Sequence, residues 1–257
     1  MRILIKIGSA LTNKDSKFNY ELIKEKVKEI SSLHKENNEI ILVSSGAVAC
    51  GMEAEKLNQR PKDTLKLQLL SGEGQVILMK NYRDLFEKEN IRISQVLLTH
   101  HNFETEKEKD TIINILNAYL KQGIIPIINE NDLINKEELE DNKLFPDNDI
   151  LAALVAKEIN ANLAIILTDV NGLCKSNPKT NKDSELIEEV INIDENIKNM
   201  AQKDTNSLGL GGMYSKVIAA EMLAKSGINT IIANGNLNIN DILKNKVKRT
   251  IFKAEKL

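Results

Sequence analysis

The sequence predicts an α/β fold, a three-layer α/β/α sandwich around a mostly parallel central sheet. Two observations lead to this prediction. Short runs rich in isoleucine and valine alternate with long amphipathic stretches along most of the chain. Several of these runs are apolar at consecutive positions, which is typical of parallel strands buried on both faces by helices. A repeated strand–helix–strand order then gives right-handed crossovers in one layered sheet.

The first half of the chain shows this alternation clearly. Apolar residues at positions 22, 23, 27, 30 and 33 follow the period of a helix. Four consecutive apolar residues at positions 40–43 indicate a strand buried on both faces. The elements expected here are strand Ile3–Ile7, helix Tyr20–Glu36, strand Glu39–Ser44, helix Thr64–Lys88 and strand Ile91–Thr99.

The second half continues the pattern with one interruption. A turn-rich stretch after Asp169 predicts a hairpin-like excursion from the layered order. We expect one domain over residues 1–257, with an N-terminal lobe of about 1–162 and a C-terminal lobe of about 163–257. The expected elements are helix Phe103–Lys121, strand Ile124–Ile128, helix Asp149–Ile159, strand Leu163–Leu167, helix Met213–Ser226, strand Ile228–Ala233, a short helix and strand Arg249–Phe252.

Composition excludes several classes of function. The formal net charge of -2 gives no global basic field, so we expect no nucleic-acid partner. No run of 18 apolar residues occurs, and the short apolar N-terminus is broken by Lys6, so neither a membrane span nor a signal peptide is expected. Cys50 and Cys174 have no pairing or metal spacing, and the three histidines have no partner at ligand spacing. We therefore expect a cytoplasmic protein with reduced thiols.

Small and charged residues follow the predicted strands. In open α/β sheets, ligands bind beyond the carboxyl ends of the strands, so these positions are candidates for a site. A lysine within a buried strand is costly unless an anion faces it, although its side chain could instead reach out of the sheet end. The residues are Lys6, Gly8 and Ser9; Ser44 to Ala47; Asn129 to Asp132; and Thr168 with Asp169.

Two further segments open predicted helices. Leu210–Lys216 is a glycine-rich turn whose helix N-terminus favours phosphate, or it is only a loop before a helix. Asp147-Asn148-Asp149 is either a helix cap or a pair of carboxylates that binds a metal or positions lysines. The chain contains neither a GxxxxGK[ST] loop nor a GxGxxG fingerprint, which excludes those two nucleotide-binding motifs.

Taken together, these segments resemble the amino-acid kinase family. The resemblance spans nearly the whole chain in the family's order, and within the family it points to the branch that phosphorylates the side-chain carboxylate of glutamate for proline biosynthesis. Its most specific stretches are Asn129–Asp132 and Asp147–Asp149. The other resembling stretches are Lys6–Ser9, Val43–Gly51, Leu167–Leu173 and Gly209–Lys216.

The resemblance implies a role for each motif residue. Lys6 and Lys216 would contact the ATP phosphates, and Asp149 would orient both lysines. Glutamate would bind to the N-terminal lobe, where Asp132 would face its ammonium group and Ser45 and Asn148 would donate to its carboxylate. ATP would bind mainly to the C-terminal lobe. Besides the two lysines, the implied ATP-binding residues are Gly8, Ser9, Thr168, Asp169, Leu210, Gly211, Gly212, Met213, Tyr214 and Ser215.

The same resemblance implies the partners. ATP would be the co-substrate and would carry Mg²⁺, with no separate metal site on the protein. Proline would act as feedback inhibitor, a glutamyl phosphate reductase is a possible partner, and the enzyme would form a homo-oligomer. Ala10 and Leu210 stand where family members commonly carry hydroxyl residues, and the chain stops about where many members begin a PUA domain. Acetylglutamate, carbamate and uridylate kinases remain alternatives, as does a non-catalytic amino-acid sensor.

Overall fold

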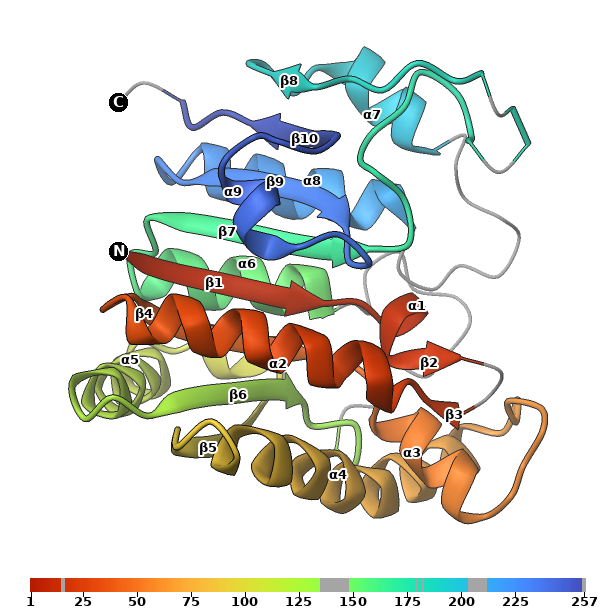
Figure 1. Cartoon of the computed structure of the whole chain (residues 1–257), viewed down its shortest axis with the longest axis vertical. Coiled ribbons are helices and arrows are strands. Elements are labelled where there is room, and N and C mark those ends of the chain that lie inside the picture. The colour runs from red at the N-terminus through yellow and green to blue at the C-terminus, as the bar shows by residue number, and fades with distance from the viewer. Residues whose placement is uncertain (15–16, 135–147, 179, 182, 203–211, 256–257) are drawn as a thin grey trace.

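The computed structural model describes residues 1–14, 17–134, 148–178, 180–181, 183–202 and 212–255. Its main feature is an eight-stranded sheet in the order β5-β6-β4-β1-β7-β9-β10-β8 (Figure 1). Neighbouring strands are parallel except β9 and β10, which are antiparallel. In chain order the strands are β1 (Arg2–Ile7), β4 (Glu39–Ser44), β5 (Ile93–Leu98), β6 (Ile125–Glu130), β7 (Leu163–Thr168), β8 (Glu189–Val190), β9 (Asn229–Asn234) and β10 (Arg249–Phe252).

Helices cover both faces of this sheet (Figure 1). Alternate residues of β1 show why: Ile3, Ile5 and Ile7 pack in one apolar core, and Leu4 packs in the other. The first core is covered by α2 (Tyr20–Lys35), α4 (Thr64–Glu87) and α9 (Ile239–Leu243). The second is covered by α5 (Glu106–Lys121), α6 (Asn148–Glu158), α7 (Glu195–Gln202) and α8 (Met213–Ala224). The predicted three-layer α/β/α sandwich with a mostly parallel sheet is therefore confirmed.

Most predicted element boundaries differ from the structure by one or two residues, and one helix start differs by three. The strand expected at Ile91–Thr99 is shorter, because it covers only Ile93–Leu98. The helix expected from Phe103 begins at Glu106 instead, and a 3-10 helix, η1 (His100–Phe103), precedes it. The later start has a local cause, since the Thr105 hydroxyl accepts a hydrogen bond from the backbone N–H of Glu108 and caps α5.

Several short elements carry too few residues to show a period in the sequence. These are α1 (Ser9–Thr12), β2 (Asn13–Lys14), β3 (Lys17–Phe18), α3 (Ala47–Ala54), β8 and α7. The expected excursion after Asp169 does contain an antiparallel bridge, between Cys174 and Leu186. Cys50 and Cys174 are both buried and are not joined in a disulfide.

Glycines let α3 and α4 pack backbone to backbone. Gly46 begins α3 with φ of 121°, a conformation that side chains rarely adopt. A Cβ at Gly74 of α4 would lie only 1.8 Å from the carbonyl oxygen of Ala47. This contact fixes α4 beside the turn that follows β4. Among the described helices, none is both long and apolar enough to cross a membrane.

Candidate active site

The candidate site is built where the central strands end. Ile7 at the end of β1 is in register with Ser44 of β4 on one side and with Leu167 of β7 on the other. The residues that follow these strands therefore meet at one edge of the sheet, as expected for a ligand site in a parallel α/β fold.

Two buried lysines share one buried carboxylate at this edge. Lys6 Nζ on β1 lies 2.5 Å from Asp149 Oδ1 on α6. Lys216 Nζ, in the first turn of α8, lies 2.9 Å from Asp149 Oδ2. The exposed fractions of Lys6, Asp149 and Lys216 are 2%, 0% and 4%. Residues far apart in the sequence thus form one charged cluster, and Asp149 holds both ammonium groups in place.

The electrostatics of this cluster favour an anionic ligand. Burial alone would raise the pKa of the Asp149 carboxyl, but the charges of Lys216 and Lys6 and the hydrogen bonds they donate hold this pKa well below its usual range. The carboxylate is therefore ionised, and the three side chains together carry a formal charge of +1. The Ser215 hydroxyl donates to Asp149 Oδ2 at 3.1 Å and so helps to fix the carboxylate.

Glycines flank both lysines. The N–H of Gly8 donates to the carbonyl of Leu167 at 3.1 Å, and a Cβ at residue 8 would lie 3.6 Å from Lys6 Nζ. Gly212 precedes α8 without a side-chain cap, and the contact of Lys216 with Asp149 places the start of that helix at the same edge of the sheet. A phosphate can be bound by the first amides of a helix. Of the other predicted residues, Leu210, Gly211 and Asp147 lie outside the described residues.

The predicted glutamate residues Ser45 and Asn148 are in direct contact. Asn148 Nδ2, at the first residue of α6, donates to Ser45 Oγ at 3.0 Å. It also donates to Asn129 Oδ1 at 3.1 Å. The donors of Asn148, which the sequence suggested for the substrate, are thus directed at protein groups. Asn148 Oδ1 is buried and has no hydrogen-bond partner among the described residues.

Asp132 is held by helix α4. The Ser71 hydroxyl donates to the Asp132 carboxylate, and Gln68 Nε2 donates to the Leu133 carbonyl at 3.1 Å. One turn further along α4, Gln75 Oε1 accepts from Asn129 Nδ2 at 2.8 Å. Sequence reasoning missed these three α4 residues. Their spacing of three and four residues was the available signal, because it places polar groups on one face of the helix.

One of the residues expected on the ATP side, Asp169, lines a cavity. Thr168 is buried, and its hydroxyl donates to Asp169 Oδ1 at 3.3 Å, while Asp169 is exposed. A cavity of about 1000 Å³ lies next to Asp169, Asn171 and Asn234, at the ends of β7 and β9. Ser9 is exposed at the start of α1, Tyr214 is half-buried and Met213 is buried at the start of α8.

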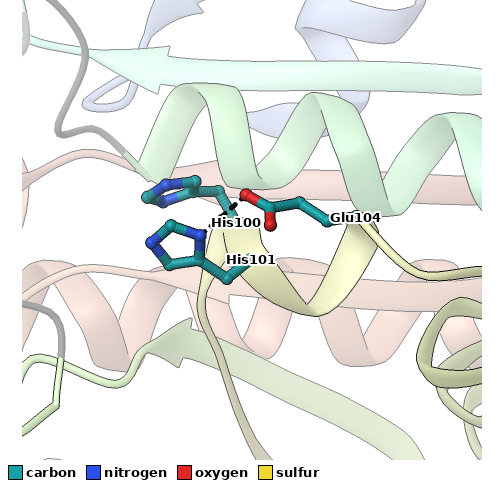
Figure 2. Close-up of side chains that lie close together, drawn as sticks. All are labelled: His100, His101 and Glu104. Atoms are coloured by element: carbon teal, nitrogen blue, oxygen red, sulfur yellow. Dashed lines mark hydrogen bonds and ion pairs between the residues drawn. The ribbon is translucent and has the colours of Figure 1, made fainter.

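A separate histidine cluster begins η1, after the edge strand β5 (Figure 2). The rings of His100 and His101 lie with their centroids 3.9 Å apart, and His101 Nδ1 lies 2.7 Å from Glu104 Oε1. The prediction that these histidines have no partner at ligand spacing is wrong for His101, because Glu104 lies within reach of it. The His101 and Glu104 side chains are 54% and 63% exposed. We assign this surface cluster no part in the site at the strand ends.

The sequence of this chain is similar to several curated proteins. A glutamate 5-kinase from Clostridium acetobutylicum is 39% identical over 98% of this chain and 94% of that protein. One from Ligilactobacillus salivarius is 38% identical over 98% of the chain and 95% of that protein. One from Hydrogenovibrio crunogenus is 39% identical over 91% of the chain, which corresponds to only 61% of that longer protein.

Solved structures share the fold at low sequence identity. A carbamate kinase from Giardia lamblia bound to AMP-PNP has a TM-score of 0.67 and 15% identity, over 99% of this chain and 98% of that one. A UMP kinase from Ureaplasma parvum has a TM-score of 0.64 and 18% identity, over 98% of both chains. The family model "Amino acid kinase family" matches residues 1–234. The chain therefore belongs to the amino acid kinase family, and within it the sequence groups with the glutamate 5-kinases.

Proposed function

We propose that this protein transfers the γ-phosphoryl group of ATP to the side-chain carboxylate of L-glutamate, the glutamate 5-kinase reaction that begins proline biosynthesis. The products are glutamyl 5-phosphate and ADP. The single observation that carries this proposal is the bridge that Asp149 makes between Lys6 and Lys216, at 2.5 and 2.9 Å. The grouping with curated glutamate 5-kinases supports the choice of glutamate.

We place the two substrates on opposite sides of this bridge. Glutamate binds on the side of β4 and β6, where Ser45, Asp132 and Asn148 are gathered. ATP binds on the side of β7 and β9, where Asp169, next to Thr168, lines the cavity. The boundary is the pairing of β1 with β7, so the N-terminal lobe carries the acceptor and the C-terminal lobe carries the nucleotide. The two lysines then lie between the substrates.

The chemistry requires positioning and charge neutralisation rather than a base. The glutamate side chain has an ordinary pKa of about 4.3, so its carboxylate is already ionised at neutral pH. One carboxylate oxygen forms a bond to the γ-phosphorus while the bond to the bridging oxygen breaks, and that electron pair leaves with ADP. A lysine about 4 Å from a phosphate oxygen stabilises the charge by about 4 kcal/mol at an effective dielectric near 20. Lys6 and Lys216 supply two such charges.

We place Mg²⁺ on the ATP phosphates and not in a protein site at the bridge. The two oxygens of Asp149 each face a lysine ammonium group, and these two positive charges disfavour a second cation at the same carboxylate. When bound, the ion neutralises phosphate charge. The protein's own contribution is to hold both lysines against the same phosphates.

Other acceptors and a non-catalytic sensor are the competing functions. The paired lysines argue against a sensor, because a protein that only binds an amino acid does not need two buried ammonium groups on one carboxylate. The test is ADP release with ATP and one acceptor at a time: glutamate, N-acetylglutamate, carbamate or UMP. Release that depends on glutamate supports the proposal. Release with another acceptor only, or with none of the four, contradicts it.

We also propose which enzyme acts next, where the protein is located, how it assembles and what inhibits it. The product is an acyl phosphate that water hydrolyses readily, so we propose a glutamyl phosphate reductase as the next enzyme and a cytoplasmic location. We also propose a homo-oligomer, because α4 exposes Leu65, Leu69 and Val76 on one face, with exposed fractions of 62%, 57% and 72%. Proline is proposed as an inhibitor that binds at the glutamate site.

A further inference from the structure

A chain of buried amides connects α4 to the glutamate side of the site. The members are Gln75 on α4, Asn129 on β6 and Asn148 on α6, with exposed fractions of 8%, 3% and 8%. Asn129 Nδ2 donates to Gln75 Oε1 at 2.8 Å, and Asn148 Nδ2 donates to Asn129 Oδ1 at 3.1 Å. Three segments that are separate in the sequence thus hold one another by side-chain hydrogen bonds.

A backbone group fixes the direction of this chain. The N–H of Glu130 donates to Asn129 Oδ1 at 3.0 Å, and a backbone N–H can only donate. The Asn129 atom that faces it must therefore be the carbonyl oxygen. That oxygen only accepts, so the Asn148 atom in contact with it must be the amide nitrogen. The hydrogen-bond network therefore determines which side-chain atom of Asn129 and of Asn148 is the oxygen and which is the nitrogen.

The side-chain oxygen of Asn148 remains available to accept a hydrogen bond from the ligand. Its nitrogen donates to both Asn129 and Ser45. Its oxygen, Oδ1, is buried without a partner among the described residues. A buried carbonyl oxygen requires a donor, and the ammonium group of an amino acid is one. Ser45 Oγ accepts from Asn148, so the Ser45 hydroxyl hydrogen points away from Asn148 and can reach a carboxylate.

We propose that Gln75 is a positioning residue that makes this site selective for an acceptor with a free, protonated α-amino group. This inference rests on the proposed function. Gln75 holds Asn129 through its Oε1, and Asn129 in turn holds Asn148 with its carbonyl oxygen available for the substrate ammonium. Without the Gln75 acceptor, Asn129 Nδ2 is buried with no partner, and Asn129 moves out of the pose that orients Asn148.

The test compares two variants of nearly the same size. Gln75→Met removes the acceptor and keeps the volume, whereas Gln75→Glu keeps an oxygen that accepts from Asn129 Nδ2. For each, initial rates give KM for glutamate, KM for ATP and kcat, and inhibition gives Ki for glutarate, which is glutamate without the amino group. Thermal unfolding of both variants shows whether the protein is folded.

For Gln75→Met we expect KM for glutamate to rise about tenfold, with KM for ATP and Ki for glutarate changed less than about twofold. Gln75→Glu should stay within about twofold of the unchanged protein, because the acceptor is retained. Equal losses in both variants, or an equal rise for glutarate and glutamate, would show that Gln75 only fills space and would overturn the inference.

The design separates this inference from the proposed function. If the unchanged protein does not phosphorylate glutamate, the proposed function fails on its own. Calorimetric titration of glutamate and glutarate into the unchanged protein and Gln75→Met then still tests the amide chain. Selective weakening of glutamate supports the inference, and parallel weakening or no change contradicts it.

Discussion

At the scale of single residues, the lysines that share Asp149 should carry most of the rate. Lys6→Met and Lys216→Met keep much of the side-chain volume and remove the charge. We expect each to lower kcat by about 100-fold or more, because each ammonium group stabilises charge that develops during transfer. The measurement is ADP release at saturating ATP and glutamate.

Lys26 offers a matched control for these two variants. It is also a buried lysine, with 1% of its surface exposed, but its ammonium group contacts Glu29 Oε1 and the carbonyl of Leu237, each at 2.8 Å. Lys26→Met should keep kcat within about threefold of the value for the unchanged protein, even where the free energy of unfolding falls. If Lys26→Met loses activity as strongly as Lys6→Met, buried charge in general matters and the assignment of Lys6 and Lys216 is wrong.

Asp132 should govern the affinity for glutamate. Asp132→Asn keeps the shape and removes the charge that pairs with the substrate ammonium. We expect KM for glutamate to rise at least about tenfold, roughly 1.4 kcal/mol, while KM for ATP changes little. Ser71→Ala, which removes the hydroxyl that donates to Asp132, should give a smaller rise in the same parameter. A rise in KM for ATP alone would move Asp132 to the nucleotide side.

The sequence indicated some residues of the site and not others for a physical reason. Lys6 and Lys216 were found because charge beside glycine at a strand end or helix start is unusual. Gln75 and Ser71 were missed because a polar residue within a helix is normally exposed, and their burial depends on α4 packing across β6. The acceptor role that we propose for Asn148 could not be predicted from the sequence either, since it depends on a backbone N–H elsewhere in the fold.

At the scale of elements, the close contact of α3 and α4 should depend on Gly74. A Cβ there would lie 1.8 Å from Ala47 O and 2.4 Å from Gly51 N, both backbone atoms that cannot move away. We expect Gly74→Ala to lower the free energy of unfolding by more than about 2 kcal/mol, as measured in urea.

Gly72, in the same helix, is the control for this change. A Cβ at Gly72 would meet only the side chain of Leu133, with its nearest atom at 2.9 Å, and that side chain can shift. Because alanine favours a helix over glycine, Gly72→Ala should be close to neutral or mildly stabilising. Equal losses at Gly72 and Gly74 would show that the contact between α3 and α4 is not the constraint.

The elements that could be predicted are those long enough to show a period. The strands β4 and β10 have the expected bounds, and α2, α4, α6 and α8 agree to within two residues. The short elements α1, β2, β3 and β8 could not be predicted, because two to four residues carry no period and their conformation is set by neighbours. The order of strands in the sheet likewise depends on packing between distant segments.

At the scale of the whole molecule, the glutamate side should also bind proline. Proline carries the same carboxylate and a protonated amine, so it can meet Ser45, Asp132 and the Asn148 carbonyl oxygen in the same way. We expect rates at a glutamate concentration near KM to fall as proline rises into the millimolar range, and to recover with more glutamate. A flat response, or inhibition that glutamate does not relieve, would contradict an overlapping site.

The most direct test of the whole account identifies the phosphorylated atom. The protein is incubated with ATP, Mg²⁺ and glutamate in the presence of hydroxylamine, which converts an acyl phosphate to a stable hydroxamate. Mass spectrometry with authentic standards then distinguishes the γ-hydroxamate from the α-hydroxamate. We expect glutamyl γ-hydroxamate in an amount equal to the ADP released. ADP formed without any γ-hydroxamate, or the α-hydroxamate alone, would contradict this account.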